Sequence, residues 1–219
     1  MAFWPHRIDE GEPGSGGRKP VPDLEHLRQT LQHRFERVLA PLAALLHRLG
    51  ASANQVSVAG FALNVGAATL VVGGHLVPAG ALYLFAGLLD LLDGVLARAG
   101  GKPTRFGAFL DSTLDRASEG VVFAAIGYRF AAEGSALDAS IVVLALLGSF
   151  LVSYVRARAE GLGAECRVGI ATRAERVVLI ALGLLSGMLA EAIRLVALLT
   201  AVTVVQRIAC ARRGLRASG

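Results

Sequence analysis

The sequence predicts an all-α, polytopic membrane protein with six transmembrane helices preceded by an amphipathic interfacial helix. Three observations lead to this prediction. Hydrophobic residues make up 54% of the 219-residue chain and the mean hydropathy is +0.56, which is too apolar for an ordinary soluble domain of this length. The apolar residues gather in runs of the length that helices need to cross a bilayer. Basic residues gather in alternate connections between those runs.

The N-terminal part of the chain is expected to precede the membrane spans. Residues 1–22 are rich in proline, glycine and charge and lack the apolar core of a signal peptide, so we expect a disordered, uncleaved tail. Residues 23–49 carry leucines at helical spacing with arginines at intervening positions. A helix of this kind suits the membrane surface. We therefore expect one membrane domain over residues 23–219, with the interfacial helix at 23–49 and the spans at about 55–210.

The membrane spans are predicted by comparing each apolar run with the ~20 residues that a helix needs to cross the hydrocarbon core. Six runs come close to this length, at approximately residues 55–72, 77–97, 108–130, 137–157, 174–190 and 193–210.

The distribution of basic residues predicts the orientation. Arg98, Lys102 and Arg105 follow the second run, five arginines follow the fourth, and three more lie at the C-terminus. The opposite connections hold little beyond Arg129 and Arg194. By the positive-inside rule, both termini and the loops after the second and fourth runs are expected on the cytoplasmic side of the cell (inner) membrane.

Two other interpretations of the composition find little support. A net charge of +5 is compatible with nucleic-acid binding, but no basic stripe interleaved with aromatic residues and no nucleic-acid module is recognisable. Cys166 and Cys210 are far apart and have no metal-ligand spacing, so we expect two small packing residues rather than a disulfide or a zinc site.

Four aspartates lie at the predicted cytoplasmic ends of the second and third spans. Asp90 and Asp93 are three residues apart and Asp111 and Asp115 four apart, so each pair shares one face of its helix. Two facing helices would bring all four carboxylates together. An isolated carboxylate in a membrane costs roughly 2.5 kcal/mol or more, so the four need compensation. An all-oxygen, anionic set of this kind suits two hard divalent cations, Mg²⁺ or Mn²⁺.

Alternative interpretations of the same aspartates remain open. They could lie scattered at the solvent interface or pair with Arg98, Arg105 and Arg116. A cation or proton transporter also uses membrane acids, although it would place them near the bilayer midplane and on broken helices. A pure scaffold would leave the matched spacings unexplained.

The residues after the first aspartate pair indicate a phosphate-containing ligand. Gly94 and Ala97 have little or no side chain, so a base or a diphosphate can approach the helix backbone closely. Arg98 then offers a guanidinium to a phosphate.

These positions together resemble the signature of the CDP-alcohol phosphotransferase family. The match runs without a gap over eight fixed positions: Asp90, Asp93, Gly94, Ala97, Arg98, Gly107, Asp111 and Asp115. The six-span prediction is also similar to that family's fold. The resemblance implies a membrane enzyme that transfers a phosphatidyl group from CDP-diacylglycerol to a small alcohol and releases CMP. It also implies a homodimer, because family members are commonly dimeric.

The resemblance implies a role for each matching residue. The four aspartates would bind two divalent metal ions, and Asp115 would also act as the catalytic base. The CDP group would be bound by six residues: Asn54, Ser57, Gly94, Ala97, Arg98 and Gly107. Asn54 and Ser57 match a family segment before the first span, although the usual proline is replaced by Ala53.

An arginine-rich cluster on the last three spans indicates an anionic acceptor alcohol. Guanidinium groups bind phosphate bidentately, so an acceptor that already carries a phosphate is favoured over serine or choline. The segment 153–160 and the later basic residues resemble the branch that uses inositol phosphate, although actinobacterial members usually have Lys at Arg156 and Pro at Ala174. This branch implies acceptor-phosphate binding by Ser153, Arg156, Arg176 and Arg207. Glycerol 3-phosphate, used by phosphatidylglycerophosphate synthases, is the alternative acceptor.

Overall fold

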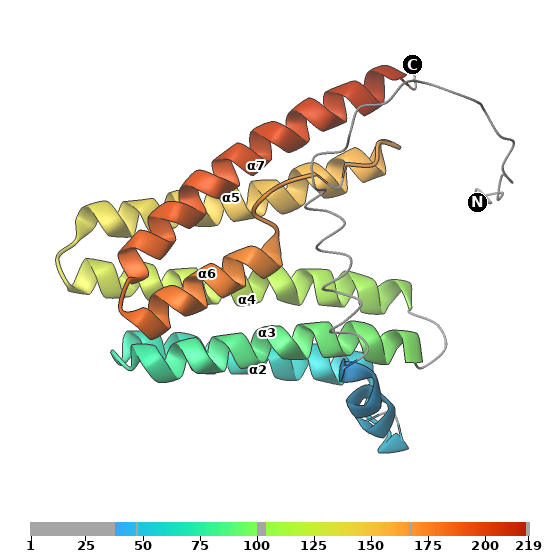
Figure 1. Ribbon diagram of the computed structural model, residues 1–219, viewed down its shortest axis with the longest axis horizontal. Coiled ribbons are helices and arrows are strands. Elements are labelled where there is room, and N and C mark those ends of the chain that lie inside the picture. Colours follow the sequence, from blue (N-terminus) through green and yellow to red (C-terminus); the bar gives the residue numbers. More distant parts are fainter. Residues whose placement is uncertain (1–37, 47, 100–103, 167, 218–219) are drawn as a thin grey trace, which may run out of the picture.

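The computed structural model describes residues 38–46, 48–99, 104–166 and 168–217, and every regular element in these ranges is a helix. A short helix covers residues 38–46 and is the described part of the predicted interfacial helix. The predicted tail at residues 1–22 lies outside the described residues. Six longer helices follow (Figure 1): α2 Ala53–Val72, α3 Leu76–Ala99, α4 Arg105–Ala132, α5 Ala136–Gly161, α6 Arg173–Ser186 and α7 Leu189–Ala217.

The helix ends follow from local sequence. Ser52 caps α2 with a capping box, in which its side chain accepts from Gln55 N and its own N–H donates to Gln55 Oε1. Thr104 caps α4 by accepting from Gly107 N at 2.9 Å. The three tight turns between successive helices each contain a glycine with positive φ, at positions 74, 134 and 187. Each of the six predicted spans therefore corresponds to one helix.

Four of the helices, α2, α3, α5 and α7, are long and apolar enough to cross a membrane by length and composition. Among the described residues, α4 and α6 do not meet this measure. α4 has 28 residues but carries several charged side chains, while α6 has only 14, roughly 21 Å at 1.5 Å per residue. A hydrocarbon core is roughly 30 Å thick, so α6 by itself is short for a full crossing.

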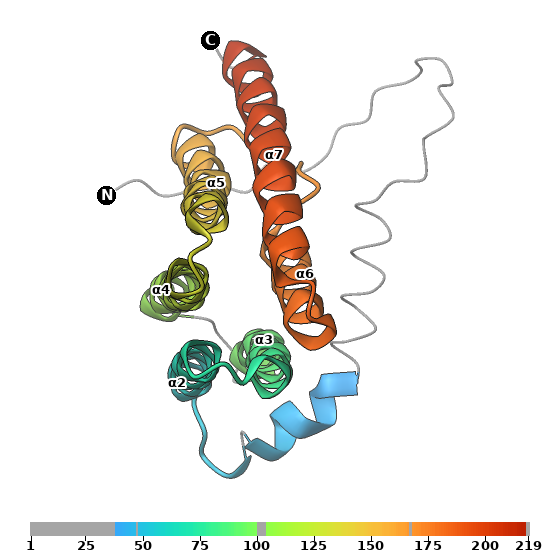
Figure 2. The ribbon, with the colours of Figure 1, turned by 90° about the vertical axis from the view of Figure 1, so that its left-hand side faces the viewer.

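The six helices pack as a ring, and Figure 2 looks roughly along the axes of α2 to α5, with α7 slanting across the view. α3 contacts α2, α2 contacts α4, α4 contacts α5, α5 contacts α7, α7 contacts α6, and α6 contacts α3. The main core fills this ring with Phe123 and Ile126 of α4 against Ile180 and Leu184 of α6, all 0–1% exposed. Large apolar side chains such as Leu198 point outward instead, as expected where lipid replaces water.

The contact between α3 and α6 depends on glycine. A Cβ at Gly80 would lie 3.0 Å from Leu184 Cβ and 3.1 Å from the backbone oxygen of Ala181. A Cβ at Gly87 would lie 3.1 Å from Val177 Cγ1. Small residues of this kind let membrane helices approach closely, which matters because lipid gives no hydrophobic force between them.

The connection between α5 and α6 lies against α7. Ala171 N donates to Thr203 Oγ1 at 3.0 Å, and Arg207 Nε donates to Val168 O at 2.9 Å. Gly169 has φ +138°, and a Cβ there would be 2.5 Å from Thr203 Cγ2, so both conformation and space require glycine. The loop is thereby held on one face of α7.

A disulfide continues this attachment further along α7. Cys166 in the loop is bonded to Cys210, with 5.9 Å between their Cα atoms. The sequence-based expectation of two unpaired packing cysteines was therefore wrong. Thr203, Arg207 and Cys210 recur every three or four residues on one face of α7. The loop runs antiparallel to that face, which brings Cys166 to Cys210; this geometry cannot be seen from the sequence separation of 44 residues.

The close approach at Gly80 can be tested with alanine. Gly80→Ala should destabilise the protein by about 1–2 kcal/mol, because overpacking against the fixed Ala181 carbonyl exceeds the gain in helix propensity. Gly127→Ala in α4 is the matched control, since its Cβ would meet Val142 at an ordinary 3.5 Å. Thermal unfolding in detergent measures both. Equal stability of the two variants would contradict the role given to Gly80.

Candidate active site

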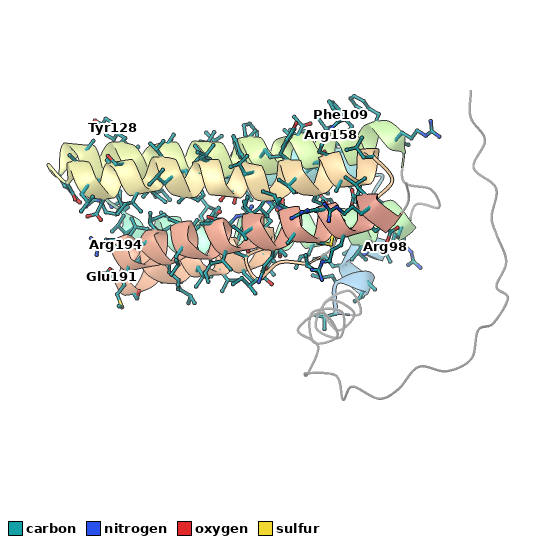
Figure 3. All side chains as sticks on the ribbon, turned by 90° about the horizontal axis from the view of Figure 1, so that it is seen from above. Arg98, Phe109, Tyr128, Arg158, Glu191 and Arg194 are labelled. Carbon is teal, nitrogen blue, oxygen red and sulfur yellow. A yellow bond between two sulfur atoms is a disulfide. The ribbon has the colours of Figure 1, made fainter. Side chains whose placement is uncertain are left out.

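The polar residues of interest lie on one side of the bundle. The N-terminal ends of α2, α4 and α6 and the C-terminal ends of α3, α5 and α7 face this side, on the right in Figure 1. Figure 3 shows Arg98 and Arg158 toward this end and Glu191 and Arg194 toward the other. Two cavities open here, one over α2, α3 and α4 and the other between α4, α5, α6 and α7.

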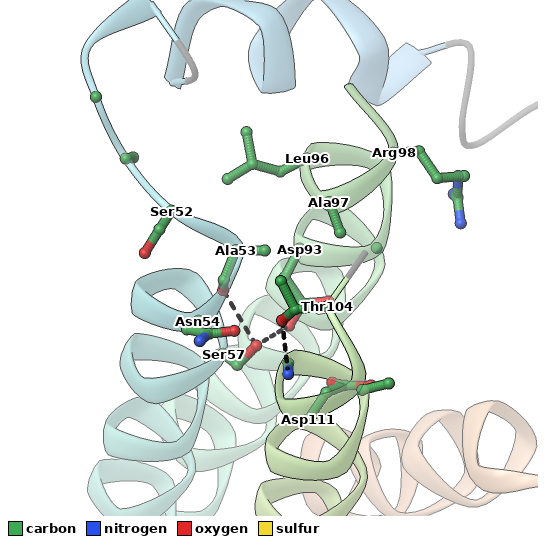
Figure 4. Close-up of a pocket in the computed structure, with 15 residues that line it drawn as sticks. Ser52, Ala53, Asn54, Ser57, Asp93, Leu96, Ala97, Arg98, Thr104 and Asp111 are labelled. Carbon is green, nitrogen blue, oxygen red and sulfur yellow. Dashed lines mark hydrogen bonds between the residues drawn. The ribbon is translucent and has the colours of Figure 1, made fainter. Parts of the chain in front are cut away.

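The first cavity has a volume of about 550 Å³ and contains every residue predicted to bind CDP (Figure 4). The helix starts of α2 and α4 and the last turns of α3 form its walls. The lining residues named by the prediction are Asn54, Ser57, Gly94, Ala97, Arg98 and Gly107, together with the aspartates Asp93 and Asp111. The structure thus brings together residues separated by more than fifty positions.

Hydrogen bonds and close contacts hold the polar groups of this cavity in place. Ser57 Oγ donates to Asp93 Oδ2 at 2.6 Å, which gives the 5% exposed Asp93 a donor (Figure 4). A Cβ at Gly107 would lie 2.9 Å from Thr104 Oγ1 and 3.1 Å from Asn54 Oδ1. Glycine is therefore required for α4 to start this close to α2.

Three of the four aspartates line one or other of the cavities, and Asp90 lines neither. Asp93 and Asp111 line the first cavity, and Asp115 lines the second. Arg173, the first residue of α6, pairs with Asp90 and, at 3.0 Å, with Asp115. As the side chains of the described residues stand, no three His, Cys, Asp or Glu groups converge on a point where one ion would be held.

The donor set nevertheless fits divalent cations. It consists of carboxylate oxygens alone, which hard ions such as Mg²⁺ and Mn²⁺ prefer. Two of the four carboxylates, Asp90 and Asp115, already hold a cation of the chain itself, the guanidinium of Arg173. A metal ion would compete with this guanidinium for their oxygens.

The second cavity has a volume of about 250 Å³ and is strongly basic. All four residues predicted to bind the acceptor phosphate line it: Ser153, Arg156, Arg176 and Arg207. Arg116 and Arg173 add further positive charge, and Asp115 and Glu119 are its acids.

The arginines of this cavity differ in how far they are already engaged. Arg176 is 1% exposed and donates from Nε and Nη2 to both oxygens of Glu119, at 2.6 and 2.9 Å, and from Nη1 to Ala171 O. Arg207 Nη1 donates to Val152 O at 2.6 Å, in addition to its bond to the loop. Arg156 is instead exposed and pairs with Glu160 on its own helix. The first two therefore hold helices and loop together as well as lining the cavity.

Sequence reasoning missed Glu119, which is 3% exposed beneath the second cavity. A signal was available, because Glu119 follows Asp115 by four residues and continues the acidic face of the same helix. An acid inside an apolar run is also expensive enough to indicate a partner. Its partner, 57 residues away, could not be inferred from spacing.

The fold and the site together define a class of protein. It is a helical membrane protein in which an aspartate cluster lies between a nucleotide-sized cavity and a basic cavity. This is the arrangement that a metal-dependent transferase of phosphate-linked groups needs. Residues 51–206 match the family model described as CDP-alcohol phosphatidyltransferase. The chain belongs to this family and is a transferase.

Named relatives and solved structures agree with this assignment. The chain is 38% identical over 170 residues to the archaetidylinositol phosphate synthase of Methanothermobacter thermautotrophicus, covering 77% of this chain and 83% of that protein. It is similar to the crystal structure of the phosphatidylinositol phosphate synthase of Mycobacterium tuberculosis with CDP-DAG bound, with a TM-score of 0.74, 32% identity and coverage of 80% and 94%. The same enzyme in complex with manganese and citrate matches with a TM-score of 0.73, 31% identity and coverage of 80% and 88%.

The buried pair of Glu119 and Arg176 generates a stability prediction. Arg176→Met leaves the carboxylate of Glu119 buried without its partner and should destabilise the protein by about 3–5 kcal/mol. The double variant Glu119→Leu/Arg176→Met removes both charges and should recover most of that loss. Thermal unfolding in detergent checks both variants. If Arg176→Met unfolded at the wild-type temperature, the pair would have no structural role.

Proposed function

We propose that this protein transfers the phosphatidyl group of CDP-diacylglycerol to a hydroxyl of an inositol phosphate and releases CMP. One observation carries the proposal: the aspartate cluster lies between two cavities of different character, and Asp115 is the one aspartate of the four that lines the basic cavity. A nucleotide donor and an anionic acceptor would therefore meet at these carboxylates. The family assignment gives the reaction type, and the arginines favour the acceptor class.

The first cavity is proposed to hold the CDP group. Gly94 and Ala97 present a nearly bare stretch of α3, and a Cβ at Gly94 would lie 3.7 Å from Arg98 Nη1, so the guanidinium lies over this stretch. A diphosphate there would meet both backbone and positive charge. Asn54 and Ser57 line the opposite wall at the start of α2. The complex of the related mycobacterial enzyme with CDP-DAG supports this assignment.

The aspartates are proposed to hold two divalent cations, Mg²⁺ or Mn²⁺. When bound, these would neutralise the donor diphosphate and stabilise the charge that develops as CMP leaves. The manganese complex of the related enzyme supports a divalent ion.

Asp115 is proposed as the base because it faces the acceptor side. The acceptor oxygen forms a bond to the phosphorus of the phosphatidyl group, the bond from that phosphorus to CMP breaks, and CMP leaves with the electron pair. The hydroxyl proton passes to the Asp115 carboxylate, and the position of Asp115 on the wall of the second cavity supports this role.

The acceptor is proposed to carry a phosphate because the second cavity is basic. Arg156 is the most accessible of its guanidinium groups, since its only described contact, to Glu160 at i+4, is an exposed ion pair of small worth. Relatives named archaetidylinositol and phosphatidylinositol phosphate synthases favour inositol phosphate over glycerol 3-phosphate. The cavity chemistry fits both acceptors, so the relatives decide between them.

We further propose that all six helices cross the membrane, as a homodimer in the cell membrane, with both termini and both cavities on the cytoplasmic side. α4 and α6 are needed to close the ring of helices, which supports their crossing. The arginines in the connections on the cavity side support the orientation.

The metal site predicts the effect of a neutral substitution. Asp111→Asn keeps the side-chain volume but removes one anionic oxygen ligand, so Mn²⁺-dependent CMP release should fall by at least about a hundredfold. The protein should still insert and unfold at a similar temperature, because Asp111 is partly exposed and makes no ion pair with a described residue. Retention of most activity would rule out this site.

The acceptor site predicts different outcomes for two neighbouring arginines. Arg156→Gln removes a charge-assisted contact of roughly 1.5–3 kcal/mol, so the acceptor KM should rise about 10- to 150-fold while the KM for CDP-diacylglycerol stays unchanged. Arg158→Gln is the matched control, since Arg158 lies on the same helix but lines neither cavity. CMP release with inositol phosphate, free inositol and glycerol 3-phosphate is measured for each protein. Equal rates with free inositol would show that no phosphate pocket exists.

A further inference from the structure

Arg173 links the second cavity to two of the four aspartates. It begins α6, lines the second cavity and reaches across to the aspartates of both α3 and α4. Its Nη1 pairs with Asp90 Oδ2 and, at 3.0 Å, with Asp115 Oδ1. One guanidinium nitrogen therefore bridges two of the four carboxylates that a divalent cation would use.

The contacts of Arg173 are fewer than those of Arg176, one helical turn later. Arg176 uses Nε, Nη1 and Nη2 in hydrogen bonds and is buried. The ion pairs of Arg173 run through Nη1, while its Nε is buried with no hydrogen-bond partner among the described residues. The side chain of Arg173 also remains 26% exposed toward the second cavity. Arg176 is therefore fixed on three sides, whereas Arg173 is held at the edge of the second cavity by its contacts with two aspartates.

A divalent cation and Arg173 cannot use the same carboxylate oxygens together. Both are positive, and the oxygens of Asp90 and Asp115 that face Arg173 would have to turn toward the metal. The described carboxylates do not converge as they stand, and two of the four are drawn toward Arg173. Coordination of a divalent metal by all four carboxylates would therefore require Asp90 and Asp115 to be released from Arg173.

We propose that Arg173 is an internal counter-cation that competes with the divalent metal for Asp90 and Asp115 and is displaced toward the second cavity when the metal binds. This inference rests on the metal site of the proposed function and adds a positioning role for a residue on a third helix. Apparent metal affinity is then lowered in proportion to the fraction of molecules in which Arg173 is paired. Arg173 already lines the basic cavity, and displacement frees its guanidinium for an acceptor phosphate only after the metal is in place.

The test measures Mn²⁺ binding by full-length protein in detergent after treatment with a chelator, using the electron paramagnetic resonance signal of free Mn²⁺. Arg173→Gln should bind Mn²⁺ at least about tenfold more tightly than wild type, because the competitor is gone. The same variant should unfold at a lower temperature than wild type in chelator, and saturating Mn²⁺ should remove that difference. Arg116→Gln is the matched control, since Arg116 lines the same cavity and its Nη1 contacts Ser112 O of its own helix.

Each outcome is decisive. If Arg173→Gln binds Mn²⁺ no more tightly than wild type, or if Arg116→Gln gains as much affinity, displacement of Arg173 is excluded and the proposed reaction is untouched. If wild type binds no Mn²⁺, the metal site and this inference fail together. If Arg173→Gln gains affinity selectively but wild type releases no CMP with inositol phosphate, the acceptor assignment fails and the counter-cation role stands.

Discussion

Carboxylates inside an apolar helix bundle need a cation or a hydrogen-bond donor, and the way each is compensated shapes one whole side of this protein. Both carboxylate oxygens of Glu119 accept hydrogen bonds from Arg176, which ties α4 to α6. Arg176 also donates to Ala171 O and so holds the loop before α6. Asp90 and Asp115 receive Arg173. The position of α6 relative to α3 and α4 therefore follows from pairing buried charge as well as from apolar packing, since breaking such a pair is costly.

The basic cavity shows that positive charges of the same type have different functions. The guanidinium groups of Arg176 and Arg207 are engaged by Glu119 and by backbone carbonyls, so they set the shape of the cavity. The side chains of Arg156 and Arg173 remain partly exposed at its edge. The fixed arginines, Arg176 and Arg207, support the more exposed ones that can contact a ligand, because a binding site needs rigid residues behind those that touch the ligand.

The ring of helices explains how a small bundle holds two polar cavities. Glycine at positions 80 and 87 lets α6 approach α3 closely, and both cavities open at one end of the bundle. The loop between α5 and α6 is fastened along α7 by Thr203, Arg207 and the disulfide of Cys210. That loop leads directly into Arg173, so its attachment positions the residue that bridges the aspartates.

The sequence alone determined the helices and the shared faces of the aspartates, because these depend on local periods and spacings. The residues of the first cavity were predicted through the resemblance of their spacing to the family signature. The apolar runs predicted six helices, the first four within a few residues of the observed bounds, but the boundary between the last two was placed at residues 190–193, whereas α6 ends at Ser186 and α7 begins at Leu189. The spacing of the aspartates predicted that each pair shares one helix face. Only the tertiary structure decided which charges pair. The bonds of Arg176 to Glu119, of Arg173 to Asp90 and of Cys166 to the last helix join residues from 44 to 83 positions apart, and such contacts follow from how helices pack around a ring, which no local pattern encodes.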